Sequence, residues 1–67
     1  MAKIQLNGKK ITIKLNTTIN DLLKKLKINN KKIAIEHNGT IISKTNYNKK
    51  YLKSGDRLEV VHFIGGG

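Results

Sequence analysis

Cysteine, proline and tryptophan are absent from this 67-residue sequence, and histidine is scarce. Without cysteine there is no disulfide, no thiolate metal ligand and no cysteine nucleophile. The two histidines, His37 and His62, have no accompanying ligand cluster, whereas a zinc site normally needs three or four ligands, so we expect no bound metal. No apolar run approaches the ~20 residues that span a bilayer, and the first residues lack a signal-peptide pattern. These absences predict a cytoplasmic protein.

Acidic residues are also few, since four acids against fourteen basic residues give a net charge of +10. A charge this high raises binding to nucleic acid or to an anionic membrane as a hypothesis. Arg57 is the only arginine, however, although arginine is the preferred reader of phosphates and bases. The lysines are scattered, and the abundant lysine, asparagine and isoleucine share A/T-rich codons. We therefore favour a solvated lysine surface and expect neither nucleic acid nor membrane as a partner.

The first sixteen residues have the pattern of a β-hairpin. "KIQLN" and "KITIKL" both alternate polar and apolar residues, which is typical of strands with one buried face. Asn7 and Gly8 lie between them, and an Asn-Gly pair between two such runs is a strong hairpin signal.

The period then changes to that of a helix. Ile19, Leu22, Leu23 and Leu26 are spaced as one apolar helical stripe, which predicts a helix over residues 18–28. Thr17 or Thr18 is suited to the N-cap position, with Asp21 in the first turn. "NN" at 29–30 is typical of a left-handed helix stop.

The second half of the sequence returns to strands. "KIAIE" precedes a second Asn-Gly pair, at 38–39, which predicts a turn into a short strand with Ile41 and Ile42. In "KTNYNKKYLKSGD" we expect a short helical turn anchored by Tyr47, Tyr51 and Leu52, and then a tight turn at "SGD". "RLEVVHF" forms the last predicted strand.

The predicted order is therefore ββαβββ, an α+β fold in which one helix covers one face of a mixed five-stranded sheet. With the first and last strands side by side in the middle, this is a β-grasp, or ubiquitin-like, fold. Its expected core is Ile4, Leu6, Ile11, Ile13, Leu15, Ile19, Leu22, Leu23, Leu26, Ile33, Ile35, Leu58 and Val60.

Ile64, Gly65, Gly66 and Gly67 follow the last predicted strand directly. Glycines lack side chains, so such a segment can pass through a narrow channel. The reactive group is the α-carboxylate of Gly67, which becomes an electrophile when it is joined to AMP. Glycine-rich ends are often plain disorder, but this one follows a complete β-grasp pattern. We expect residues 1–64 to form the domain and residues 65–67 a flexible tail that carries the chemistry.

The sequence resembles the ThiS family, the sulfur carriers of thiamine biosynthesis, over essentially its full length. The resemblance lies in "LNG", in the helix "TINDLLKKL", in "IAIEHNGTIIS" and above all in "LKSGDRLEVVHFIGGG". The related small subunit of molybdopterin synthase is usually longer and carries prolines before its glycines, and this sequence has no proline. The charge of +10 and "SK" at 43–44, in place of a proline-containing turn, depart from the family pattern.

The resemblance implies a reaction cycle. A ThiF-type adenylating enzyme would consume ATP to activate the carboxylate of Gly67, and a sulfur-donor persulfide protein would convert it to a thiocarboxylate. A ThiG-type thiazole synthase would then receive the sulfur. The chain itself would be a carrier and not an enzyme, with no bound cofactor, and a monomer when free.

The last strand also predicts a docking surface. If the helix covers the face with Leu58 and Val60, then Val61 and Phe63 project from the other face, where Glu59 also lies, and exposed aromatic residues often anchor interfaces. Alternatively, Phe63 folds over a sheet edge and only stabilises the strand. Other functions also stay open: a sulfur carrier for another pathway such as molybdopterin synthesis, a protein modifier joined to lysine, and a small basic nucleic-acid binder.

Overall fold

The structure is a computed structural model that describes residues 1–62. Single-turn 3₁₀ helices precede β3 and follow β4. In chain order the elements are β1 (Ala2–Leu6), β2 (Lys9–Ile13), α1 (Ile19–Lys25), a 3₁₀ helix (Asn30–Lys32), β3 (Ile33–His37), β4 (Thr40–Ile42), a 3₁₀ helix (Lys44–Asn46) and β5 (Arg57–His62). The predicted order ββαβββ is confirmed.

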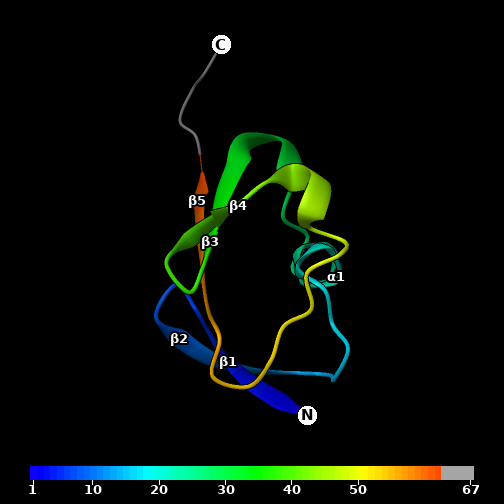
Figure 1. Cartoon of the computed structure of the whole chain (residues 1–67), viewed down its shortest axis with the longest axis vertical. Coiled ribbons are helices and arrows are strands. Elements are labelled where there is room, and N and C mark those ends of the chain that lie inside the picture. Colours follow the sequence, from blue (N-terminus) through cyan, green and yellow to red (C-terminus); the bar gives the residue numbers. More distant parts are fainter. Residues whose placement is uncertain (63–67) are drawn as a thin grey trace.

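All five strands form one mixed sheet in the order β2-β1-β5-β3-β4. The first and last strands are neighbours and run parallel, with Gln5 opposite Arg57 and Leu6 opposite Leu58. The other three pairings are antiparallel. Helix α1 lies on one side of this sheet, as Figure 1 shows, so among residues 1–62 one face is covered by the helix and the other, the open face, is not. This is the β-grasp arrangement that the sequence predicts.

Each Asn-Gly pair makes a tight hairpin turn. Asn7 and Gly8 have φ of 49° and 82°, and Asn38 and Gly39 have φ of 51° and 86°. Two successive residues with positive φ match the right-handed twist of the flanking strands, and asparagine and glycine adopt that region more readily than other residues. The sheet therefore consists of two Asn-Gly hairpins that are joined by β5.

Helix α1 begins as predicted but ends earlier. Thr18 is the N-cap, its hydroxyl accepts from the Asp21 N–H at 3.0 Å, and the Asp21 carboxylate accepts from the Thr18 N–H at 3.2 Å, which completes a capping box. The expected stop at 29–30 is wrong, because Lys27 takes the left-handed conformation, with φ of 58°. The N–H groups of Lys27 and Ile28 then bond to the carbonyls of Lys24 and Leu23, as in a Schellman motif.

The long loop before β5 closes over the start of α1. The Ile19 N–H donates to the Lys50 carbonyl at 3.0 Å, and the Asn20 N–H donates to the Tyr47 carbonyl at 2.9 Å. Backbone N–H groups that have no partner within the helix are thereby satisfied. The expected helical turn in this loop is confirmed, and Tyr47 is buried as predicted, but the expected anchor Tyr51 is 53% exposed.

The core lies between α1 and the covered face of the sheet. Nine of the expected core residues are buried: Ile4, Ile13, Ile19, Leu22, Leu23, Ile33, Ile35, Leu58 and Val60. Leu6 and Ile11 are partly buried against them. Leu15 and Leu26 were expected in the core and are exposed, because β2 ends at Ile13 and α1 ends at Lys25.

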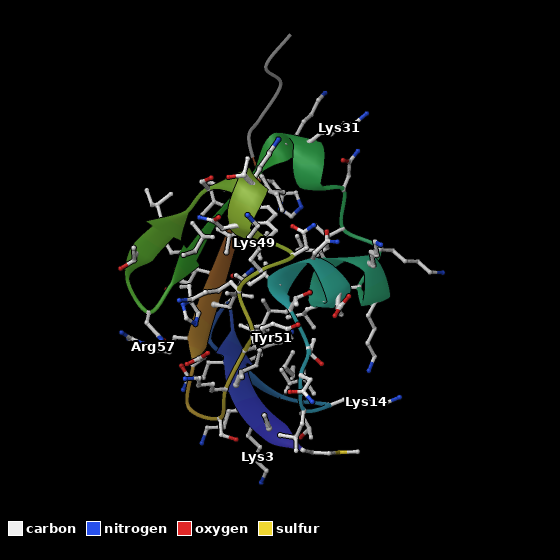
Figure 2. The ribbon with its side chains drawn as sticks, turned by 45° about the vertical axis from the view of Figure 1, so that its right-hand side comes forward. Lys3, Lys14, Lys31, Lys49, Tyr51 and Arg57 are labelled. Atoms are coloured by element: carbon white, nitrogen blue, oxygen red, sulfur yellow. The ribbon has the colours of Figure 1, made fainter. Side chains whose placement is uncertain are left out.

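The lysines, all within the described range, are exposed. Figure 2 shows Lys3, Lys14, Lys31 and Lys49 at separate places around the ribbon rather than in one stripe. Within residues 1–62, every helix is too short and too polar to cross a membrane.

Candidate functional site

The part of the structure that leads to the candidate tail is β5. It occupies the middle of the sheet, between β1 and β3, and ends at His62. Its two flanks are paired differently, since β3 lies beside it from Leu58 to His62 but β1 ends beside Leu58. Beyond that point the β1 side of β5 needs another source of hydrogen bonds, because unpaired buried backbone groups are costly.

Asn7 supplies those hydrogen bonds. Its backbone N–H donates to the Leu58 carbonyl at 2.9 Å. Its side-chain Oδ1 accepts from the Val60 N–H at 2.8 Å, and its Nδ2 donates to the Val60 carbonyl at 3.4 Å. The amide side chain thus takes the place of the next residue of β1, which has already turned away. This contact holds β5 on its β1 side beyond the end of β1.

Asn38, the asparagine of the other Asn-Gly turn, holds the beginning of β5 from the opposite side. Its Oδ1 accepts from the Arg57 N–H at 2.7 Å, and its backbone N–H donates to the Arg57 carbonyl at 2.8 Å. Both hairpin turns therefore use an asparagine side chain to bind the backbone of β5. The two asparagines together hold the central strand from Arg57 to Val60.

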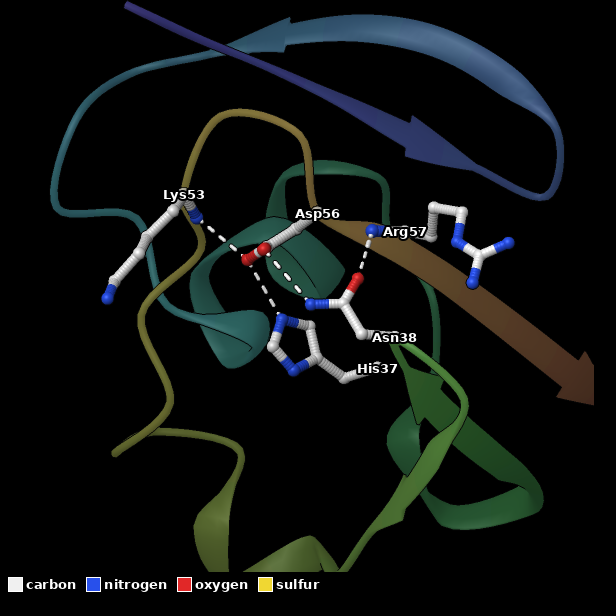
Figure 3. A network of polar contacts seen from close by, with 5 residues as sticks. All are labelled: His37, Asn38, Lys53, Asp56 and Arg57. Carbon is white, nitrogen blue, oxygen red and sulfur yellow. Dashed lines mark hydrogen bonds and ion pairs between the residues drawn. The ribbon is translucent and has the colours of Figure 1, made fainter.

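A buried carboxylate connects the second turn to the residues just before β5, as Figure 3 shows. Asp56 accepts from the Lys53 N–H at 2.8 Å, from Asn38 Nδ2 at 3.2 Å and contacts His37 Nε2 at 2.8 Å. The side chains of His37 and Asp56 are only 11% and 12% exposed. His37 is therefore a partner of the Asp56 carboxylate within the fold.

The pKa of Asp56 lies below its ordinary value. Burial by itself raises the pKa, but hydrogen bonds from His37, the Lys53 N–H and Asn38, together with the charge on His37, outweigh that effect. Burial also raises the pKa of the Tyr47 hydroxyl. The carboxylate of Asp56 is thus held in its charged form by the turn that begins β5.

Two predicted docking residues, Glu59 and Val61, lie on β5. Both are exposed, and they face away from the buried Leu58 and Val60 because side chains alternate along a strand. Val61 is 51% exposed and lies opposite Ala34 on β3. The remaining predicted site residues lie outside the described residues: Phe63, Ile64, Gly65, Gly66 and Gly67.

The described residues hold no group of three histidines, acids or cysteines that could bind a metal ion. What their geometry provides is a central strand that is fixed on both sides and leads directly to residues 63–67. The sequence pattern did not reveal Asn7, Asn38, His37 or Asp56 as the residues that fix it. The two Asn-Gly pairs signalled only turns, and their contacts with β5 cross more than eighteen residues of sequence.

Comparison with known proteins identifies relatives over nearly the whole chain. Residues 4–67 match the model of the ThiS family. The chain is 45% identical over 65 residues to the sulfur carrier protein ThiS of Bacillus subtilis (strain 168), covering 96% of the chain and 98% of that protein. It is also 42% identical to a thiazole synthase of Magnetococcus marinus over 97% of the chain, but it spans only 20% of the length of that protein.

Solved structures agree with the fold. A crystal structure of the thiamine biosynthesis protein ThiS from Geobacter metallireducens superimposes with a TM-score of 0.83 at 28% sequence identity, covering 97% of the chain and 99% of the solved chain. A solution structure of a thiamine biosynthesis protein from the same bacterium gives a TM-score of 0.77, also at 28% identity, covering 97% of the chain and 87% of the solved chain.

Proposed function

The chain belongs to the ThiS family, and we propose that it is a sulfur carrier of thiamine biosynthesis whose cargo is bound at the carboxylate of Gly67. The full-length similarity to the Bacillus subtilis carrier supports this role. The observation that carries the proposal is the position of β5, which is held by Asn7 and Asn38 and leads directly to "FIGGG". The chain would be acted on by enzymes and would not be one itself.

The first chemical step follows from the nature of a carboxylate, which is a poor electrophile. We propose that a ThiF-type adenylating enzyme joins the carboxylate of Gly67 to AMP, consuming ATP and releasing pyrophosphate. The terminal sulfur of a persulfide donor protein would then attack the carbonyl carbon, with AMP as the leaving group, to give an acyl disulfide. A second thiol would cleave that disulfide, releasing the thiocarboxylate and forming a disulfide with the donor's sulfur. Glycine at this position hinders the attack least. We expect these steps to occur in the cytoplasm, because adenylation consumes ATP.

Thiazole synthase is the proposed recipient of the sulfur. Two relatives named thiazole synthase, from Magnetococcus marinus and Paramagnetospirillum magneticum, match this chain over a fifth of their length. A carrier-like region within a synthase places donor and acceptor in one molecule, which raises their effective concentration. For the separate chain, we propose a transient complex of a monomeric carrier with the synthase.

The proposed division of labour within the chain is simple. Residues 1–64 would form the domain, and residues 65–67 would be the segment that enters the partner's active site, with Ile64 at the junction. We propose that Glu59, Val61 and Phe63 contact the adenylating enzyme, since Glu59 and Val61 are exposed on the last described strand before the tail.

Intact-mass measurement tests the function. The chain is incubated with ATP, a sulfur source and an adenylating enzyme that is known to act on the Bacillus subtilis carrier, which serves as the positive control. Replacement of one terminal oxygen by sulfur supports the proposal, and a variant that lacks Gly66 and Gly67 should remain unchanged. Attachment of the chain to a lysine would instead support a protein modifier. No change of mass, while the control carrier reacts, would contradict both functions.

A further inference from the structure

The outward side chains of β5 differ in character at each step along the strand. Arg57, Glu59 and Val61 all face away from α1 and are exposed, so a cation, an anion and an apolar group follow one another at intervals of about 7 Å. Neighbouring strands extend the first two of these into bands across the open face of the sheet. Along β5, toward the proposed tail, the outward side chains are therefore first basic, then acidic and then apolar. We call this sequence the charge order of the face.

The basic band lies at the beginning of β5. Gln5 on β1 is opposite Lys10 on one side and opposite Arg57 on the other, so these two cations lie in one row across three strands. Lys3 lies two residues before Gln5 on the same face. A hollow of about 600 Å³ is lined by three cations, Lys3, Lys10 and Arg57, and by one acid, Asp56, whose carboxylate is engaged by His37 and Asn38. Three cations against one acid give the hollow a net positive lining, which suits acidic side chains.

The acidic band is the next row along β5. Glu36 on β3 lies directly opposite Glu59, and both residues are exposed. Like charges that are directly opposite one another destabilise a sheet. These are two of only four acids in a chain of net charge +10, and within residues 1–62 neither forms an ion pair. A hollow of about 230 Å³ lies between them and Arg57. The stability of the fold does not account for this pairing.

We propose that the open face of the sheet binds a partner protein surface of reversed charge order, with acidic side chains opposite Lys3, Lys10 and Arg57 and a basic side chain opposite Glu36 and Glu59. This inference rests on the proposed function, because the partner to which we assign this surface is the thiazole synthase. The two bands fix the direction of docking along β5, which sets where the tail is delivered. Arg57 lines the same hollow but forms no ion pair with either acid within residues 1–62, so the acidic pair would form its ion pair in the complex.

A protein surface fits this face better than a polyanion does. Nucleic acid presents negative charge along its whole backbone. Such a backbone bound at Arg57 would meet Glu59 and Glu36 in the adjacent row, because both belong to the wall of the same small hollow as Arg57. A folded partner can instead present charges of both signs in register, which is how complementary interfaces select their partner and orientation.

The test uses two double variants of opposite sign and one matched control. Lys10→Gln with Arg57→Gln removes two positive charges from the face, and Glu36→Gln with Glu59→Gln removes two negative ones. Lys24→Gln with Lys25→Gln removes two exposed positive charges from α1 instead. The dissociation constant of each full-length variant with the thiazole synthase of the same organism is measured by calorimetry, and each variant's unfolding temperature is recorded.

Both face variants should weaken binding by about fivefold or more, while the α1 control should change it by less than about twofold. The variant with Glu36→Gln and Glu59→Gln should unfold at the same temperature as the unaltered chain or at a higher one. Its weaker binding would then not result from a loss of fold. If loss of the two positive charges weakened binding while loss of the two negative charges strengthened it, the proposal would be overturned. The chain would then be attracted to a negative surface in general. Unchanged binding in both, or no binding by the unaltered chain, would also overturn it. The sulfur-carrier function itself is tested separately: it would be contradicted if the intact-mass experiment showed no replacement of oxygen by sulfur.

Discussion

Asn7 Oδ1 lies 2.8 Å from the backbone nitrogen of Val60, fifty-three residues further along the chain. The same side chain donates to the Val60 carbonyl, so one residue both makes the first hairpin turn and extends the pairing of the central strand. Substitution by glycine separates the two roles of Asn7, because glycine readily adopts the left-handed backbone of the turn but lacks the side-chain amide that binds Val60.

We therefore expect Asn7→Gly to lower the free energy of unfolding by about 1–3 kcal/mol. The reason is that the N–H of Val60, a residue that is only 7% exposed, is left without its partner. Urea denaturation measures this. Asn16→Gly is the matched control, since Asn16 also has a positive φ, of 63°, and is exposed. Asn16→Gly should be neutral or stabilising. Equal stability of the two variants would show that the Asn7 contact contributes nothing.

A second prediction concerns acid stability. The folded pKa of Asp56 is below its ordinary value of 3.8, so the folded state binds this proton less readily than the unfolded chain does. Its contribution to stability is therefore complete above about pH 4 and is lost as the pH falls through the folded pKa. Asp56→Asn should reduce stability near neutral pH and flatten the acid limb of the stability curve. An unchanged acid limb in chemical denaturation from pH 2 to pH 7 would contradict this.

The end of α1 offers a stabilising substitution. Lys27 is in a left-handed conformation that side chains with a Cβ disfavour, and glycine is the usual residue at this position of a Schellman motif. Lys27→Gly should raise the free energy of unfolding by about 0.5–1 kcal/mol. Lys25→Gly, two residues earlier at the last residue of α1, should lower it by up to about 1 kcal/mol. Thermal unfolding of the pair should shift in opposite directions, and a shared direction would argue against the left-handed cap.

Val61 and Phe63 give a prediction about docking. Val61 is 51% exposed, so Val61→Ser should cost little stability while it weakens binding to the adenylating enzyme. Phe63→Ala should weaken the same complex and leave the fold intact. Binding is followed by calorimetry and the fold by circular dichroism. If Phe63→Ala unfolds the domain, Phe63 belongs to the core and the docking role is wrong.

Local chemistry explains which parts of the fold were predictable. The Asn-Gly turns and the start of α1 depend on residues close in sequence, and the turns, an N-cap at Thr17 or Thr18 and Asp21 in the first turn were expected. The reciprocal bond from Thr18 N–H to the Asp21 carboxylate was not. The end of α1 was not, because Lys27 carries no sequence signal for a left-handed conformation. Leu15 was assigned to the core because an alternating pattern continues past the residue at which β2 ends.

The site divides in the same way. Glu59 and Val61 were expected on the outward face of the last strand, since alternation with Leu58 and Val60 is a property of the strand itself. The contacts that fix β5 could not be predicted, because each joins residues that are distant in sequence. The opposition of Glu36 and Glu59 likewise depends on the register of two strands, which the pattern of either strand alone does not specify.

The sheet order has a consequence for how the molecule is assembled. Among residues 1–62, β5 joins the two hairpins, β1-β2 and β3-β4, into one sheet, and it is the last of these strands along the chain. Pairing Gln5 with Arg57 requires closure of a loop that contains most of the chain, and such distant contacts make folding slow. A nascent chain that has not yet exposed β5 therefore consists of two separate hairpins and a helix. Completion of the sheet therefore waits for the same strand that leads to residues 63–67.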